Sequence, residues 1–243
     1  MPPPLRALVT GFGPFPGIID NASAAVAPRL AERMARELPG VQALPAILPT
    51  EWEAAPRLLS ELVAQAQPHV CVHLGVSGAA CGGMVVETFA RNWAGDKRDA
   101  VNRLPRCSQL LADAPPLLLP VVNPLGLVGR LARAGLPVVH SLETGDYVCN
   151  AVYFHSLWLA RRCGAMASAR RQVIFIHLPV RVGSAGRAED FRDEAETLAM
   201  DSALAAIMLL LRGMLEAAGN RQQAVVDVIP CAAHHKNGGP RTG

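Results

Sequence analysis

Short apolar runs alternate along the chain with stretches of helical periodicity. The apolar runs are nearly continuous and bounded by Gly or Pro, a pattern typical of strands buried on both faces of a largely parallel sheet. They cover residues 5–10, 69–74, 136–142 and 173–178, with 41–49 as a fifth candidate. Helical patterns cover residues 22–37, 51–67, 124–134, 149–163 and 189–217. The alternation predicts a single α/β domain whose sheet is covered by helices on both faces.

Two parts of the chain depart from this alternation. Residues 91–123 hold several Arg and Pro residues in no regular pattern, and we interpret them as an active-site flap or a subunit contact. Helical periodicity is lost near the C-terminus. The domain is therefore predicted to span residues 1–218, and residues 219–243 are predicted to form a loose tail.

Composition limits the kinds of binding partner and the cellular compartment that the protein is expected to have. The 243 residues are 51% hydrophobic and carry a net charge of +3, and scattered arginines argue against nucleic-acid binding. The six cysteines include no CxxC pair, as expected for free thiols in a reducing compartment. The longest apolar run, residues 203–211, is too short for a membrane span, and the N-terminus lacks a secretory signal pattern. We expect a cytoplasmic protein without nucleic-acid or membrane partners.

Motifs for metal or nucleotide chemistry are missing from the sequence. No HExxH, P-loop or glycosidase-like pair of carboxylates occurs. Cys231, His234 and His235 lie together near the C-terminus, where a frayed end is favoured over a metal site. We therefore expect no cofactor and no metal.

Each of the four strongest strand candidates runs into an unusual feature. The loops read GFGPFPG after residues 5–10, GVSGAACGG after 69–74 and ETGDYVC after 136–142, while the last strand ends at His177. In an open parallel sheet the ligand site lies beyond the carboxyl ends of the strands. If these strands are parallel neighbours, the features converge on one crevice and Cys149 shares an edge with His177.

Cys149 stands where a nucleophile is favoured. A glycine–aspartate turn breaks the chain just before it, and helical periodicity resumes directly after the turn. A thiol in the first turn of a helix faces unpaired backbone N–H groups and the positive end of the helix dipole, and both favour the thiolate.

A thiolate needs a base, and the base needs an orienting group. Of the seven histidines, His177 is the best candidate because it ends a strand where catalytic groups sit. His73 and His140 lie in apolar strands and are expected to be hydrogen-bonded core residues. For the orienting carboxylate, the residue patterns leave Glu87 and Glu143 nearly equal.

The loop TGFGPFPG, residues 10–17, is glycine-rich but does not fit a phosphate site. Its spacing is not GxGxxG, and Pro14 and Pro16 remove backbone donors that a phosphate cradle needs. What remains is a stiff turn that carries Phe12 and Phe15, which suits a flat, uncharged ligand. The alternative, that both rings pack into the core, stays open.

Five motifs follow one another along the chain: VTGFGPF, NAS at residues 21–23, HLGVSG, ETGDYVCNAVYF and FIHLPV. In order and approximate spacing they resemble the motifs of pyroglutamyl-peptidase I, a family of cysteine peptidases. The likeness covers roughly residues 5–216. It implies a three-layer α/β/α sandwich with a largely parallel twisted sheet, of the phosphorylase/hydrolase-like type. It also implies removal of N-terminal pyroglutamate (5-oxoproline) from peptides.

The resemblance also implies roles for individual residues. Cys149 matches the family's nucleophile, His177 its histidine and Glu87 its glutamate, in a triad that acts through an acyl-enzyme. Phe12 and Phe15 match two aromatic residues that enclose the lactam ring.

Further positions match the wall of the family's pocket. The loop at Val76 supplies backbone hydrogen bonds to the lactam, and Asn21 and Val148 match wall positions. Some members carry an arginine for which Lys97 and Arg98 are both plausible equivalents. Related bacterial enzymes are often tetrameric, so a homo-oligomer is possible.

Two other functions remain open at this stage. One is a nucleoside phosphorylase-like activity on the same broad fold, with GVSGAACGG holding phosphate. The other is a catalytically silent relative that binds ligands or senses thiol oxidation. The aromatic loop and the Cys/His/Glu set favour the peptidase over both.

Overall fold

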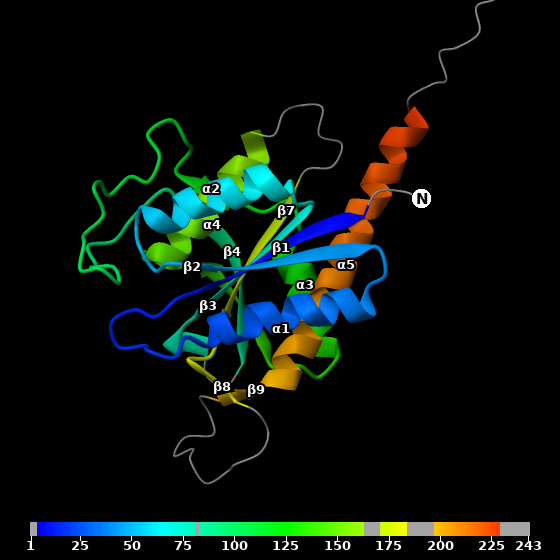
Figure 1. The fold of residues 1–243 in the computed structure, drawn as a ribbon, viewed down its shortest axis with the longest axis horizontal. Coiled ribbons are helices and arrows are strands. Elements are labelled where there is room, and N and C mark those ends of the chain that lie inside the picture. Colours follow the sequence, from blue (N-terminus) through cyan, green and yellow to red (C-terminus); the bar gives the residue numbers. More distant parts are fainter. Residues whose placement is uncertain (1–3, 81–82, 163–170, 184–196, 229–243) are drawn as a thin grey trace, which may run out of the picture.

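A mixed sheet covered on both faces by helices organises the computed structural model, which describes residues 4–80, 83–162, 171–183 and 197–228 (Figure 1). The strands are β1 (Leu5–Phe12), β2 (Val41–Leu48), β3 (Val70–Val76), β4 (Met84–Arg91), β5 (Leu117–Leu118), β6 (Val138–Glu143), β7 (Gln172–Leu178), β8 (Arg181–Gly183) and β9 (Thr197–Ala199). The helices are α1 (Ala22–Glu37), α2 (Ala54–Ala66), α3 (Pro124–Arg133), α4 (Val148–Arg162), α5 (Met200–Val228) and the short 3-10 helix η1 (Gly78–Ala80).

Strand order in the main sheet is β2-β1-β3-β7-β4-β5, with β6 also paired to β4. The strands β2, β1, β3 and β7 run parallel to one another, and β4 runs antiparallel to β7. A second, small sheet joins β8 to β9 in parallel. The carboxyl ends of β1, β3 and β7 therefore meet at one edge, where a ligand site is expected.

Helices cover the two faces of the sheet in separate groups, with α1, α3 and α5 on one side and α2 and α4 on the other (Figure 1). Each group encloses its own apolar core. The first core is built around Val72, Ile174 and Leu211, and the second around Leu8, Phe154 and Phe175. The strands contribute to both cores because their residues are buried on both faces, as in β3 and β7. The predicted three-layer α/β/α sandwich is confirmed.

The direction of one predicted strand is wrong. The run at 136–142 forms β6, which is parallel to β4 and therefore antiparallel to β1, β3 and β7. Its carboxyl end pairs with the far end of β4, at Phe89, and not with the edge at which His177 lies. The strand β4 was not predicted, because Glu87 and Thr88 interrupt its apolar run. Pairing between distant segments decides strand direction, and an apolar run carries no information on its partner.

The C-terminal boundary also differs from the prediction. The last helix was expected at residues 189–217, whereas α5 runs from Met200 to Val228. Residues 219–228 of the expected tail are therefore helical. Residues 189–196 and 229–243 lie outside the described part of the chain, as do Cys231, His234 and His235. No helix among the described residues is long and apolar enough to cross a membrane.

Candidate active site

His177 is the next-to-last residue of β7, at the edge where β1 and β3 also end. The imidazole is 6% exposed and packs against the ring of Phe175, with the two ring centroids 4.9 Å apart. On the neighbouring strand, Gly75 is the register partner of His177. A Cβ on Gly75 would lie 3.0 Å from His177 Cδ2 and from two atoms of the Phe175 ring. The missing side chain of Gly75 therefore leaves the space that the imidazole occupies.

Glu87 supplies the carboxylate beside this imidazole. The antiparallel pairing of β4 with β7 places Val85 opposite His177, so Glu87 follows on the same face of β4. Glu87 Oε1 lies 2.6 Å from His177 Nδ1, and the carboxylate is 3% exposed. The Tyr153 hydroxyl donates a weak hydrogen bond of 3.4 Å to the backbone carbonyl of Glu87. A short, buried contact to Nδ1 fixes the orientation of the ring and leaves Nε2 for another partner.

Cys149 provides that partner. It is the second residue of α4, is partly buried, and its thiol interacts with the His177 side chain strongly enough to raise the pKa of the imidazole. Burial disfavours a charged imidazole, but the hydrogen bonds and negative charges of Cys149 and Glu87 outweigh it and raise the pKa of His177 to about 9. The raised pKa favours an imidazolium beside the Cys149 thiol, which lies in the first turn of a helix, where backbone N–H groups lack partners within the helix.

The other histidines have structural environments. His73 is fully buried between the Thr10 and Ser156 hydroxyls, each 2.8 Å from a ring nitrogen, and burial lowers its pKa to about 3. The expectation of a hydrogen-bonded core histidine is confirmed for His73. It is wrong for His140, which is exposed because its strand, β6, lies at the periphery of the sheet.

The two aromatic residues of the first loop have different surroundings. Phe12 is the last residue of β1, is 1% exposed and packs against Phe175, with a centroid distance of 6.3 Å. Phe15 is partly buried and lies 6.0 Å from the Tyr147 ring. Tyr147 in turn meets Trp52 edge-on at 5.4 Å. The core alternative thus describes Phe12, whereas Phe15 belongs to an aromatic cluster beside Cys149.

Tyr147 was not predicted as a site residue from the sequence. It stands two positions before Cys149, between the turn and the helix, and this adjacency was the available signal. Burial raises the pKa of the Tyr147 phenol, and the charges of Asp99 and Cys149 raise it further.

Asn21, Val76 and Val148 lie on three different elements. Asn21 caps α1: its Oδ1 accepts the Ser23 N–H, and its Nδ2 donates to the Gly13 carbonyl, which fixes the first loop. Val76 is the last residue of β3 and is partly buried. Val148 begins α4 and is fully buried in the second core.

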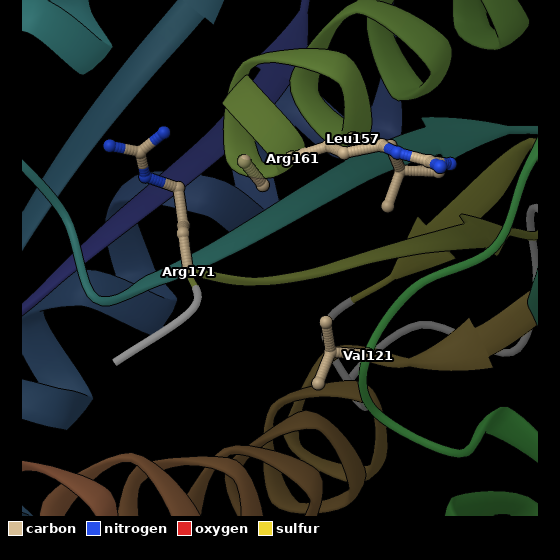
Figure 2. Close-up of a pocket in the computed structure, with 5 residues that line it drawn as sticks. Val121, Leu157, Arg161 and Arg171 are labelled. Carbon is tan, nitrogen blue, oxygen red and sulfur yellow. The ribbon is translucent and has the colours of Figure 1, made fainter. Parts of the chain in front are cut away.

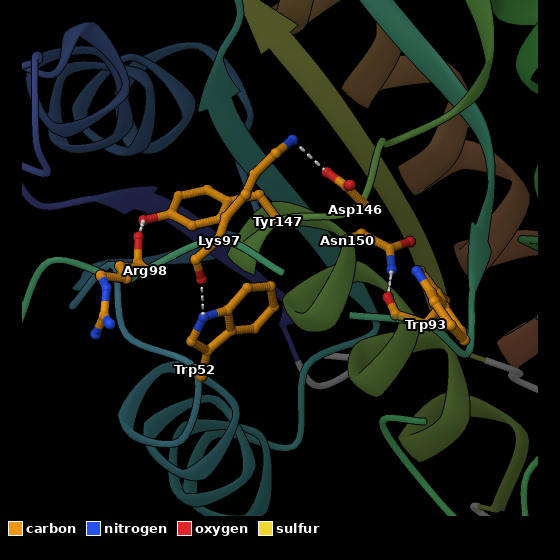
Figure 3. Close-up of polar contacts among 7 residues, drawn as sticks. All are labelled: Trp52, Trp93, Lys97, Arg98, Asp146, Tyr147 and Asn150. Atoms are coloured by element: carbon orange, nitrogen blue, oxygen red, sulfur yellow. Dashed lines mark hydrogen bonds and ion pairs between the residues drawn. The ribbon is translucent and has the colours of Figure 1, made fainter. Parts of the chain in front are cut away.

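Two asparagines fix the segment that follows Glu87. Asn150 donates to the Trp93 carbonyl (Figure 3). It also accepts the Arg91 N–H and donates to the Arg91 carbonyl, so α4 is fastened to the end of β4 directly beside Cys149. Asn92 donates to the Leu111 and Ala114 carbonyls and accepts the Leu111 N–H. Asn150 therefore holds the start of the 91–123 segment against α4, and Asn92 stabilises the fold of the segment itself.

A cavity of about 270 Å³ lies away from this site (Figure 2). It is lined by Val121, Leu157, Ala160, Arg161 and Arg171. Arg171 precedes β7 and Leu157 lies in the second half of α4, so the cavity is at the opposite ends of the elements that carry His177 and Cys149. Among the described residues, no group of three or more His, Cys, Asp or Glu side chains is placed to hold a metal ion.

Comparisons with known proteins agree with this fold. The crystal structure of pyroglutamyl peptidase I from Bacillus amyloliquefaciens superposes with a TM-score of 0.71 at 22% identity, covering 85% of this chain and 94% of that one. The pyrrolidone carboxyl peptidase of Thermococcus litoralis gives a TM-score of 0.73 at 21% identity, covering 89% and 96%. The chain thus has the fold of these peptidases.

Sequence comparison defines the class and the family. The pyrrolidone-carboxylate peptidase of Gloeobacter violaceus is 29% identical over 177 residues, covering 72% of this chain and 82% of that protein. Pyroglutamyl-peptidase 1 of Rattus norvegicus is 27% identical over 179 residues, covering 73% and 80%. The protein is a cysteine hydrolase. The family model described as pyroglutamyl peptidase matches residues 5–215, and the chain belongs to that family.

Replacing Gly75 by alanine tests the packing of the imidazole. The added methyl group would push His177 and Phe175 by a few tenths of an ångström. If His177 takes part in proton transfer, kcat is expected to fall about 3-fold to 30-fold with little change in KM, because a displaced imidazole would affect the reaction more than binding. Gly129→Ala is the matched control, since the nearest atom to its added Cβ is the mobile end of Arg133, 3.6 Å away. Equal kcat values for the two variants would contradict the role of Gly75.

Proposed function

We propose that this chain removes an N-terminal pyroglutamyl residue from peptides, with Cys149 as nucleophile, His177 as acid and base, and Glu87 as the orienting carboxylate. The observation that carries the proposal is the 2.6 Å contact between Glu87 Oε1 and His177 Nδ1. The Cys149 thiol interacts with the same imidazole. Membership of the pyroglutamyl peptidase family supports the choice of substrate.

The proposed reaction has two halves. The Cys149 thiolate attacks the carbonyl carbon that joins pyroglutamate to the next residue, and the His177 imidazolium gives its proton to the leaving amine as the C–N bond breaks. Water then attacks the thioester, the now neutral imidazole takes the water's proton, and Cys149 leaves as thiolate with pyroglutamic acid released. Glu87 stabilises the imidazolium, and N–H groups at the start of α4 stabilise the oxyanion.

The environment of the site suits a neutral lactam. A lactam has one N–H, one C=O and two flat faces, so its pocket needs aromatic surface and backbone partners but no charge. Phe15 and Tyr147 offer aromatic surface next to Cys149, and we propose that Phe12 supports the pocket from the core through Phe175. Asn21 would hold the first loop in place.

Two further positions complete the proposed pocket. The backbone at Val76, at the carboxyl end of β3, would bind the lactam amide. Val148, which is buried directly before Cys149, would close the wall.

Phe15→Ala is expected to weaken substrate binding more than catalysis. Loss of one aromatic face against the lactam is expected to raise KM about 10-fold while kcat changes by less than about 3-fold. Steady-state kinetics on a pyroglutamyl-aminocoumarin substrate measures both constants. A lowered kcat at unchanged KM would remove Phe15 from the binding site.

Hydrolysis of pyroglutamyl-aminocoumarin, with prolyl-aminocoumarin as the comparison, tests the function itself. Proline lacks the ring carbonyl and carries a charged amine, so the pocket proposed above predicts release from the pyroglutamyl substrate alone. Iodoacetamide should abolish that release by alkylating the thiol. A folded, reduced sample that releases neither fluorophore would contradict the proposal.

The thiol chemistry also bears on location. A thiolate nucleophile needs a reducing environment, and Cys107 and Cys149 are free thiols. We therefore place the enzyme in the cytoplasm. Its assembly into a homo-oligomer stays a prediction.

A further inference from the structure

A turn and a short segment that lie far apart in the sequence are joined beside the nucleophile. The turn ends with Asp146 and Tyr147, just before α4, and the segment is residues 95–98, here called the strap. The Lys97 ammonium lies 2.6 Å from Asp146 Oδ1 (Figure 3). The Gly95 N–H donates to the Asp146 carbonyl at 2.7 Å. Both contacts join the strap to one residue of the turn.

Gly95 allows the strap to approach this closely. A Cβ on Gly95 would lie 2.4 Å from Asp146 Oδ2, so any larger residue would displace the Asp146 carboxylate. The backbone of Asp146 is therefore held by one residue of the strap and its side chain by another. Because Tyr147 is the next residue, its backbone is fixed as well.

The strap also holds two aromatic rings through consecutive carbonyl groups. The Trp52 indole Nε1 donates to the Lys97 carbonyl at 2.9 Å, and the Tyr147 hydroxyl donates to the Arg98 carbonyl at 2.9 Å (Figure 3). The rings of Trp52 and Tyr147 meet edge-on, and the Tyr147 ring also lies 6.0 Å from the Phe15 ring, measured between centroids. The Tyr147 ring is thus fastened at its backbone by Asp146 and at its hydroxyl by the strap.

We propose that the Lys97–Asp146 ion pair determines affinity for the substrate ring, because it keeps the strap against the turn and so fixes the Tyr147 ring that faces the lactam. This inference rests on the function proposed above. It assigns a role to Lys97, which pairs with Asp146, and none to the side chain of Arg98, which donates instead to the nearby Asn102 carbonyl.

The Lys97–Asp146 ion pair affects binding because it positions the strap, and less through the strength of its own attraction. Its side chains are 60% and 36% exposed, so the direct attraction is weak and screened by salt. Neither group touches the triad in the described structure, so the proton transfers at His177 do not depend on it. Loss of the pair should therefore loosen Tyr147 and weaken binding while leaving the reaction of bound substrate nearly unchanged.

Lys97→Met and Asp146→Asn test the proposal. Each is expected to raise KM for pyroglutamyl-aminocoumarin about 3-fold to 10-fold with kcat changed by less than about 2-fold. The double variant should be no worse than either single one, because both changes break the same contact. Lys97→Arg keeps the charge and should restore KM. Raising NaCl from about 0.05 M to about 0.5 M should raise KM of the wild type and leave the variants unchanged.

Arg106→Met is the matched control. Arg106 belongs to the same 91–123 segment and forms an exposed ion pair with Glu53, yet it makes no contact with the turn before Cys149 in the described structure. Its KM should equal that of the wild type. A rise in KM as large as that of Lys97→Met would overturn the proposal, since loss of any surface ion pair would then have the same effect.

A second readout separates this inference from the proposed function. The lactam 2-pyrrolidone should protect Cys149 from iodoacetamide, and half-protection should require about 3-fold to 10-fold more lactam in Lys97→Met and Asp146→Asn. This measurement needs no turnover. Unshifted protection in both variants overturns the strap proposal even if the wild type hydrolyses the substrate. Lack of hydrolysis with shifted protection overturns the proposed function alone, and lack of protection in the wild type overturns both.

Discussion

Replacing Cys149 by serine is expected to lower kcat for pyroglutamyl-peptide hydrolysis by on the order of 10⁴-fold or more. The hydroxyl of serine has a far higher pKa than a thiol, so the neighbouring imidazole cannot generate an equivalent nucleophile. The substitution is nearly isosteric, so the position of α4 is expected to stay unchanged. Single-turnover and steady-state assays on pyroglutamyl-aminocoumarin measure the loss, and thermal unfolding shows whether the fold is retained.

Cys107→Ser is the matched control for the nucleophile. Cys107 is a free, exposed thiol in the 91–123 segment, so it reacts with iodoacetamide without belonging to the triad. The control variant should keep full activity and full inhibition by iodoacetamide. Turnover by Cys149→Ser at the wild-type rate, or loss of inhibition in Cys107→Ser, would remove Cys149 from the mechanism.

Glu87→Gln is expected to lower kcat by about 10²-fold to 10⁴-fold. Glutamine has nearly the shape of glutamate but carries no charge, so it cannot stabilise the imidazolium that forms at His177. Its amide can also donate to Nδ1, which would leave the proton on Nε2 and the ring in the wrong tautomer for accepting one. Steady-state kinetics at fixed pH measures the loss.

The pH profile gives this variant a second, independent readout. The pKa of His177 is raised from its ordinary 6.5 to about 9, so the imidazolium is fully formed below about 6.5 and is lost as pH rises through about 9. The alkaline limb of kcat/KM in the wild type should therefore lie near pH 9. Glu87→Gln removes one of the charges that raises this pKa, and the limb should move to lower pH.

Glu143→Gln serves as the comparison, since sequence patterns left Glu143 and Glu87 nearly equal. The proposed triad predicts that only Glu87→Gln moves the alkaline limb. A limb that moves in Glu143→Gln and not in Glu87→Gln would transfer the orienting role to Glu143.

Local patterns in the sequence determined much of this fold. The apolar runs that became β1, β3 and β7 are buried on both faces, and burial of a continuous run needs no knowledge of its partners. The same holds for Cys149 and His177. A turn before a helix and the end of a buried strand are local features, and they marked both residues.

Tertiary structure alone decided the features that depend on pairing. The reversed direction of β4 and β6 follows from hydrogen bonds between distant strands, and it is β4 that brings Glu87 to His177. The choice between Glu87 and Glu143 was closed by resemblance to a family and not by residue patterns. In the structure, Glu87 Oε1 lies 2.6 Å from His177 Nδ1.

The surroundings of the aromatic rings were likewise beyond the sequence. Phe12 and Phe15 belong to one glycine-rich motif but have different surroundings. Phe12 is the last residue of β1 and packs in the core against Phe175, whereas Phe15 contacts Tyr147. The strap reaches Asp146 only because Gly95 lacks a side chain at the point of contact. Apolar periodicity is written into neighbouring residues, whereas strand direction, ring environment and ion pairing arise from contacts between segments that only the folded chain brings together.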